Sequence, residues 1–189
     1  SFATLLIPII LLVSMMFLSG RPEQVSGSCV ACVMEGTRPI LAEVQALVTK
    51  TGFGTPRRTA NGFDYNRMNL LLAVLEKRAG YFFGTLDVYI NVVGGLRLDE
   101  PGADLSVAMA LVSSLRDKPL DEGLIAFGEI GLGGELRSVS GIAGRVREAQ
   151  RLGFTKALIP RHALSAVQDL GDSIQLLPAA NLREAFKTL

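Results

Sequence analysis

The sequence DEPGADLSVAMALVSSLRDKP, which spans Asp99–Pro119, decides the fold of this chain. A long apolar run follows Asp104 and stops before the proline, and this pattern predicts a helix that begins at Gly102 or Asp104. A second stretch, GEIGLGGELRSVSGIAGR over Gly128–Arg145, predicts glycine turns followed by the start of another helix. The two stretches therefore predict two helices, with strands and glycine turns between them in the sequence.

Alternating apolar residues and turn signals predict the remaining elements. The expected strands are 29–34, 40–48, 86–93, 124–130, 136–139, 157–159 and 173–177, with a brief strand at 96–98. The expected helices are 64–78, 104–118, 141–152, 161–169 and 181–189, and the polar segment 51–61 is expected to be a loop or a long hairpin tip. Asp64 and Asn181 are expected N-caps, and Gly80 an expected helix stop. This alternation predicts the α/β (α+β) class, with a mixed sheet and packed helices.

The stretches Asp99–Pro119 and Gly128–Arg145 resemble the proteolytic domain of the Lon proteases, in which a serine and a lysine form the catalytic pair. That family carries Gly-Pro-Ser-Ala-Gly before a helix like the one near Asp104, and its lysine follows a strand that contains Gly-Glu-Ile. Alignment without gaps from Pro101 puts Gly102 at the serine position. Alignment backward from Leu158-Ile159-Pro160 puts Ala143 at the lysine position. The resemblance implies a Lon proteolytic-domain-like fold with no catalytic residue at either position.

The chemistry of a serine–lysine pair explains why these replacements matter. A serine hydroxyl is a weak nucleophile until an adjacent base removes its proton. In a serine–lysine pair this base is a desolvated lysine with a lowered pKa. Gly102 has no hydroxyl, and no lysine lies between Pro119 and Thr155. A relocated pair of Ser106 and Lys118 is the alternative, but about three helical turns would separate the two residues. Arg145 stays protonated and cannot act as the base.

Composition limits the remaining choices. The chain has 189 residues, a net charge of +1 and two cysteines, Cys29 and Cys32. One ordinary domain fits this length, and no global basic field indicates a nucleic-acid partner. The cysteines are expected on opposite faces of a strand as buried apolar residues, not as a zinc site. His162, the sole histidine, is expected on the surface, and the low cysteine content indicates a reducing compartment such as the cytoplasm.

The first eighteen residues, Ser1–Leu18, differ from the rest because they carry no charge and are almost wholly apolar. Their length lies at the lower edge of a membrane span, and Pro8 interrupts the run. Three interpretations remain open: buried strands or an oligomer contact, a segment foreign to the native gene product, and membrane insertion. We divide the chain into this segment, 1–18, and a Lon-like domain, 19–189, and expect no membrane partner.

From Met16 onward the amino-acid sequence resembles a second, narrower family. The stretches MFLSGRPEQVSGSCV, from Met16, and EGTRPILAEVQALV, from Glu35, are similar to the RadA family (also called Sms) of bacterial DNA repair proteins. The resemblance covers Met16 to Leu189, and Ser1–Ser14 departs from it. It implies hexamers that process recombination intermediates. It also implies a zinc finger and an ATPase that binds ATP and magnesium, both in N-terminal domains absent from this chain. The chain itself has no P-loop and is expected to hold no cofactor or metal.

Basic residues provide the candidate DNA contacts, in two clusters. The candidates are Lys50, Arg57, Arg58 and Arg67 in the first cluster, and Arg145, Arg147 and Arg151 in the second. Arginine suits phosphate geometry, although any one of these residues can equally be a solvated or ion-paired side chain. No aromatic platform is expected among the charges, so binding is expected through the DNA backbone and should weaken with salt.

The two resemblances, taken with the missing catalytic pair and the basic clusters, imply two alternative functions. The first is a noncatalytic domain of a RadA-type DNA repair and recombination ATPase, which binds single-stranded or branched DNA and assembles as a homo-hexamer. A simpler hypothesis is that the domain is a scaffold whose sole role is to hold the ATPase ring together. The alternative is an ATP-dependent Lon-type serine peptidase domain with a relocated Ser/Lys dyad.

Overall fold

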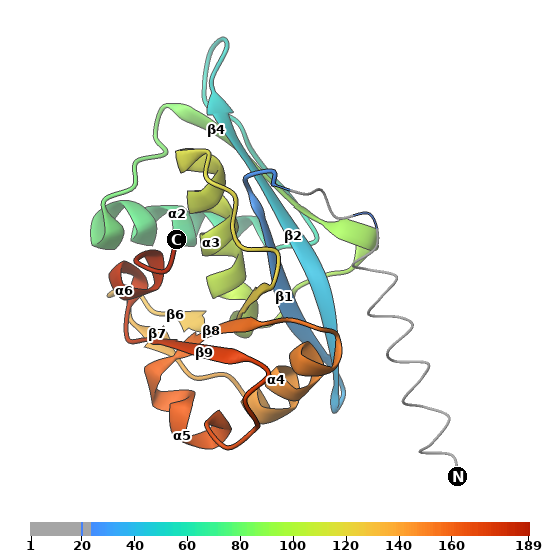
Figure 1. Ribbon diagram of the computed structural model, residues 1–189. Coiled ribbons are helices and arrows are strands. Elements are labelled where there is room, and N and C mark those ends of the chain that lie inside the picture. The colour runs from blue at the N-terminus through green and yellow to red at the C-terminus, as the bar shows by residue number, and fades with distance from the viewer. Residues whose placement is uncertain (1–19, 21–23) are drawn as a thin grey trace.

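A computed structural model describes Gly20 and residues 24–189. The expectations for Ser1–Leu18 lie outside the described residues. The described part contains a seven-stranded sheet in the order β3-β4-β2-β1-β5-β8-β9 and a separate two-stranded sheet, β6-β7 (Figure 1). The strands are β1 (Ser28–Glu35), β2 (Arg38–Lys50), β3 (Arg58–Asn61), β4 (Leu86–Val92), β5 (Leu124–Ala126), β6 (Glu129–Ile130), β7 (Leu136–Arg137), β8 (Lys156–Pro160) and β9 (Gln175–Ala179).

The helices are α2 (Tyr65–Ala79), α3 (Asp104–Arg116), α4 (Ile142–Arg151), α5 (Leu164–Val167) and α6 (Leu182–Phe186). Three short 3-10 turns are η1 (Val93–Gly95), η2 (Pro101–Ala103) and η3 (Arg161–Ala163). Strand β2 is antiparallel to both β1 and β4, whereas the other pairings of the large sheet are parallel. The predicted mixed sheet with packed helices is confirmed.

Two apolar clusters lie on opposite faces of the sheet. One includes Leu71 of α2, Met109 of α3 and Phe186 of α6, and the other includes Val146 of α4 and Val167 of α5. Figure 1 shows α2 and α3 beside the strands β1, β2 and β4, with α4 and α5 near β8 and β9. Helix α3 is buried from Asp104 through Ser113, so it forms the centre of the first cluster.

Several local predictions are confirmed. Asp64 caps α2, because its side chain accepts a 2.8 Å hydrogen bond from the Arg67 backbone N–H. Gly80 ends the same helix with φ 77°, a conformation that favours glycine. Cys29 and Cys32 contact opposite clusters, as their odd separation on a strand predicts. Burial raises the pKa of the Cys32 thiol to about 12.

The predicted strand 124–130 is wrong as a single element. Strand β5 ends at Ala126, and the chain then leaves the large sheet to form β6. The break occurs because Gly128 exchanges hydrogen bonds with the start of α3: its N–H donates to Gly102 O at 3.0 Å, and its carbonyl accepts from Leu105 N–H at 3.1 Å. These bonds replace the sheet pairing that a continuous strand needs.

Three smaller predictions also need correction. The segment 51–61 is not all loop, since it ends in β3, which pairs in parallel with β4. The segment 96–98 forms no strand, because the positive φ of Gly94 and Gly95 in η1 turns the chain away from the sheet. The predicted helix 161–169 is only η3 followed by the single turn of α5.

Candidate functional site

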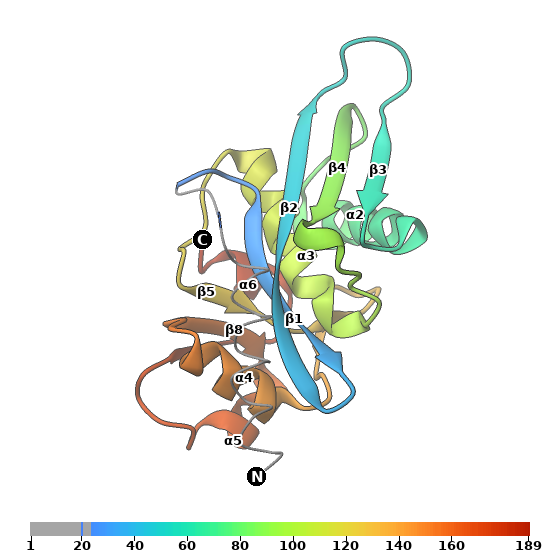
Figure 2. The ribbon, with the colours of Figure 1, turned by 90° about the vertical axis from the view of Figure 1, so that its right-hand side faces the viewer.

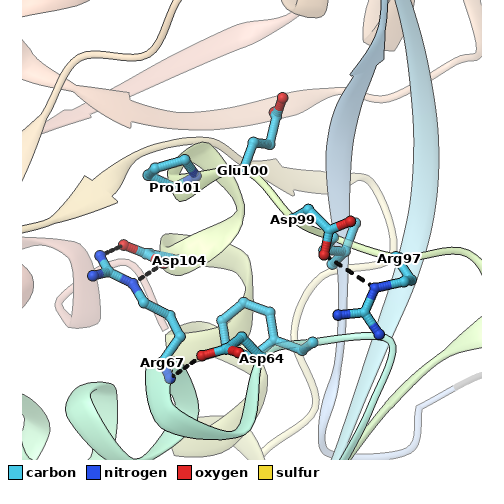
Figure 3. Close-up of a pocket in the computed structure, with 9 residues that line it drawn as sticks. Asp64, Arg67, Arg97, Asp99, Glu100, Pro101 and Asp104 are labelled. Carbon is cyan, nitrogen blue, oxygen red and sulfur yellow. Dashed lines mark hydrogen bonds and ion pairs between the residues drawn. The ribbon is translucent and has the colours of Figure 1, made fainter.

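The candidate site is built around the turn that precedes α3. Pro101 opens η2 with a fixed φ, and Gly102 follows it as a buried residue. The hydrogen bonds of Gly128 hold this turn against the end of β5. As a result, Glu100 and Asp104, on either side of the turn, are held toward different parts of the domain (Figure 3).

Asp104 forms an ion pair with Arg67 of α2. The Arg67 guanidinium donates from Nε to Asp104 Oδ1 at 3.0 Å and from Nη2 to Oδ2, and the Ile130 backbone N–H also donates to Oδ2 at 3.1 Å. Asp104 is fully buried, while the Arg67 side chain is 29% exposed. Burial raises the pKa of Asp104 above its ordinary value, although the bonds from Arg67 and Ile130 oppose that rise. This pair joins α2, α3 and β6.

Glu100 forms the second ion pair, with Arg145 of α4. Arg145 is only 1% exposed, and its guanidinium also donates to Cys32 O at 2.8 Å and to Ser140 O at 2.9 Å. The Met34 backbone N–H donates to the other carboxylate oxygen of Glu100 at 3.4 Å. The pair therefore connects the turn to β1 and α4.

A cavity of about 340 Å³ opens beside the turn. Its lining residues are Phe63, Asp64, Arg67, Arg97, Leu98, Asp99, Glu100, Pro101 and Asp104. Figure 3 shows that Arg67 and Arg97 each contact an aspartate of this lining. The described residues that line the cavity include no serine, cysteine, lysine or histidine, so the cavity presents neither a serine–lysine nor a cysteine–histidine pair.

The position of Gly102 leaves little room for a side chain. A β carbon at Gly102 would lie 2.9 Å from Val139 Cγ1 and 3.4 Å from Glu100 Oε1. Ala143 lies on α4 and packs against the apolar cluster under that helix. The place next to Gly102 is thus filled by an apolar side chain and by a carboxylate already engaged with Arg145.

The described residues do not bring a serine together with a buried lysine. The lysines are Lys50, Lys77, Lys118, Lys156 and Lys187, and all of them lie in the described part of the chain. Lys156 is half-buried and contacts Asp121 at 2.9 Å, whereas the other lysines are exposed. The hydroxyl of Ser106 is buried and donates to Ala126 O at 2.6 Å. Lys118 lies beyond α3, not on the same helix as Ser106, because Asp117 ends the helix in the left-handed conformation.

The basic candidates differ in exposure and in ion pairing. Lys50, Arg57, Arg147 and Arg151 are exposed, and Arg151 also lies 3.5 Å from a carboxylate oxygen of Glu148. Arg58 is half-buried and donates to the backbone carbonyls of Phe83 and Leu86. Arg67 and Arg145 hold the two buried pairs described above, and the burial of Arg145 leaves its guanidinium out of reach of a phosphate.

Glu148 is a buried carboxylate that sequence reasoning missed. It lies on α4, is 4% exposed, and its Oε1 has no hydrogen-bond partner among the described residues. Its Oε2 lies 3.5 Å from Arg151 Nη1. Burial raises the pKa of Glu148, and the nearby Arg151 charge only partly opposes that rise. The ionised carboxylate therefore costs folding free energy.

Glu148→Met is expected to raise the free energy of unfolding by about 1 kcal/mol at neutral pH, because the variant removes an unpaired buried oxygen. The gain should shrink as pH falls: the wild-type carboxyl binds a proton as pH passes below its raised folded-state pKa, and the penalty of burying a charge then disappears. Urea unfolding at neutral and at successively lower pH measures both effects. A variant less stable than the wild type at neutral pH would contradict this account.

The described part of the chain contains neither a cluster of metal-ligand side chains nor a helix that could span a membrane. Among Gly20 and 24–189, no three histidine, cysteine, aspartate or glutamate side chains are grouped as metal ligands would be. Within the same residues, none of the helices has both the length and the apolar character that crossing a bilayer requires.

Residues 72–187 match the Lon protease (S16) C-terminal proteolytic domain family. The chain belongs to this Lon family. It is also similar to the DNA repair protein RadA of Streptococcus pneumoniae, with 47% identity over 174 residues, which is 92% of this chain and 41% of that protein. RadA of a Streptococcus pyogenes serotype M3 strain is 46% identical over 93% of this chain and 39% of that protein. RadA of a Synechocystis species is 45% identical over 92% of this chain and 34% of that protein.

Both resemblances stated from the sequence are thereby confirmed. This Lon-family chain spans about two fifths of the length of the streptococcal RadA proteins that it matches. Sequence reasoning missed the roles of Glu100 and Asp104. A signal was present at Asp104, because it is the sole charged residue between Pro101 and Leu115 in an otherwise apolar or small-residue run. A charge in such a run indicates a buried partner.

Proposed function

We propose that this chain is the noncatalytic Lon-like domain of a RadA-type DNA repair protein, and that it contributes DNA binding and self-association. The observation that carries the proposal is the identity of 45–47% with RadA proteins over nearly the whole chain. DNA repair is the role that the names of those relatives state, and we extend it to this chain as part of the proposal.

Loss of peptidase chemistry is the second part of the proposal. We place Gly102 and Ala143 at the positions of the Lon serine and lysine. The packing of Val139 against Gly102 supports a noncatalytic site, and so does the exposure of Lys50, Lys77 and Lys118. A serine–lysine pair needs an amine with a lowered pKa, and an exposed lysine lacks the desolvation that lowers it.

DNA binding is proposed through exposed cations on two elements. Lys50 and Arg57 lie at the two ends of the connection between β2 and β3, and Arg147 and Arg151 lie on α4. Exposed cations bind phosphates mainly by releasing counterions, so the affinity should fall steeply with salt. Repetition of these small patches around a homo-hexameric ring would give one continuous basic surface, which is why we include self-association. Cytoplasmic location, ATP-driven activity and zinc belong to the proposed whole protein.

The proposal predicts a charge-specific loss of DNA affinity. In the full chain, Lys50→Ala combined with Arg57→Ala is expected to weaken binding to a fluorescent single-stranded oligonucleotide roughly tenfold at moderate salt, and to reduce the slope of log K against log salt by about 1.4. Fluorescence anisotropy at several salt concentrations measures both quantities.

The matched control removes the same charge elsewhere. Lys77→Ala combined with Lys187→Ala takes two exposed lysines from α2 and from the residue after α6. This control should retain the wild-type affinity and salt slope. Equal losses in both double variants would mean that only net charge matters, and an absence of wild-type binding would overturn the proposed function.

A further inference from the structure

The β2–β3 loop, residues 51–57, carries an aromatic side chain that no other described residue covers. Figure 2 shows this loop extending beyond the rest of the molecule. Phe53 lies within it and is 100% exposed. Its neighbours Gly52 and Gly54 have no other atoms near the position of a β carbon, so the tip stands in open space. Such exposure leaves a whole aromatic ring in water without a compensating contact.

The base of the same loop is firmly held. Asp87 of β4 accepts a 2.7 Å hydrogen bond from the Arg57 backbone N–H and a 2.9 Å bond from the Thr51 hydroxyl. The Arg57 backbone hydrogen bond lowers the pKa of Asp87, which keeps the carboxylate ionised. Strand β2 pairs with β4 up to Lys50, opposite Leu86. The β2–β3 loop is therefore a supported projection with a free aromatic tip.

The exposed charges around the tip have one sign. No acidic residue occurs between Glu43 and Asp64, whereas Lys50 and Arg57 flank Phe53 and are both exposed. Asp87 is the nearby carboxylate, and its oxygen is engaged with the backbone of the loop. The sequence expectation that no aromatic side chain lies among these charges is corrected here, because Phe53 lies between them.

We propose that Phe53 stacks on an unpaired base of single-stranded DNA while Lys50 and Arg57 contact the adjoining phosphates. An aromatic face combined with flanking cations is the pattern by which proteins bind single strands without sequence preference. This inference rests on the proposed function and adds to it the strand type and the contacting ring.

The alternative occupant, an apolar pocket of another protein, fits the β2–β3 loop less well. A stable protein interface buries about 800 Å² on each partner. Apart from Phe53, the tip between Thr51 and Pro56 offers only glycine and threonine. Base stacking needs only one ring, so it matches what the tip presents.

The test uses the absence of tryptophan from the sequence. In the full chain, Phe53→Trp supplies a single fluorescent ring at the tip, and Leu132→Trp supplies a control ring at an exposed leucine in the β6–β7 turn. Addition of an oligothymidylate is expected to quench the emission of the first variant and to leave that of the second unchanged. Duplex DNA of the same length, whose bases are paired, should quench the emission of the Phe53→Trp variant less.

Affinity measurements separate the ring from the charges. Phe53→Ala is expected to weaken oligothymidylate binding by roughly tenfold, within the range known for loss of one stacked base, and to leave the salt slope unchanged. Lys50→Ala with Arg57→Ala should instead lower that slope.

Three other outcomes would overturn the stacking inference. If Phe53→Ala binds as tightly as the wild type while the charge variant binds weakly, the stacking inference fails and the proposed DNA binding stands. A blue shift in the emission of the Phe53→Trp variant that depends on protein concentration and not on DNA would place the ring against a second copy of the chain. If the wild-type chain binds no DNA, both proposals fall.

Discussion

Arg67→Met is expected to lower the free energy of unfolding by about 3 kcal/mol, because it leaves the fully buried carboxylate of Asp104 without its ionic partner. Methionine keeps most of the apolar stem, so the loss reports the charge and its hydrogen bonds. The remaining bond, from the Ile130 N–H, cannot replace the two bonds from the guanidinium. Chemical denaturation monitored by circular dichroism measures the change.

The pH dependence identifies the cause of that loss. Burial already raises the pKa of Asp104, and removal of Arg67 takes away an interaction that lowers it. The carboxyl of the variant should therefore bind a proton at a higher pH, and the stability deficit should narrow as pH falls through that pKa. Adding Asp104→Asn to Arg67→Met should recover part of the deficit in a double-mutant cycle. A deficit that neither acid nor the second substitution reduces would exclude the ion pair as its source.

Arg145→Met is the second substitution with a large expected effect, again a loss of about 3 kcal/mol, because it removes the ionic partner of Glu100 and the guanidinium donor to Glu100 Oε1 and to two backbone carbonyls. For a chain of this size each kcal/mol shifts the melting temperature by about 2–4 °C, so a decrease of several degrees is expected. Thermal unfolding followed by circular dichroism gives this value. DNA affinity of the folded variant should equal that of the wild type, since a buried guanidinium reaches no phosphate.

Arg147→Met is the matched control on the same helix. Arg147 is exposed and two residues from Arg145, and its replacement should change the free energy of unfolding by no more than about 0.5 kcal/mol. The two variants should therefore differ strongly in stability. Similar stabilities would show that the Glu100–Arg145 pair does not hold the turn before α3.

Local signals predicted α2 well because the residues that decide its ends lie within one turn of them. Asp64 and Gly80 set the bounds of α2 through contacts inside the same segment. Strand β3 was not predicted, because its sequence RTAN has no apolar alternation and forms a strand by pairing with β4. Its structure depends on a neighbour that local sequence does not reveal.

The ion pairs could not be predicted for the same reason, although one indication was present. Glu100 and Arg145 are 45 residues apart, and the fold alone brings them together. Arg145 lies three residues after Ile142 and four before Ala149, so helical spacing already placed it on the buried face of α4. Attention to that spacing would have separated Arg145 from Arg147 on the sequence alone.

The close approach of Val139 to Gly102 limits which side chains position 102 can hold. Any residue other than glycine there must displace a valine methyl group, because its β carbon would lie 2.9 Å from Val139 Cγ1. If Gly102 stands where the Lon proteases have their serine, as we propose, a Gly102→Ser substitution would therefore lower stability before the new hydroxyl could take part in any chemistry.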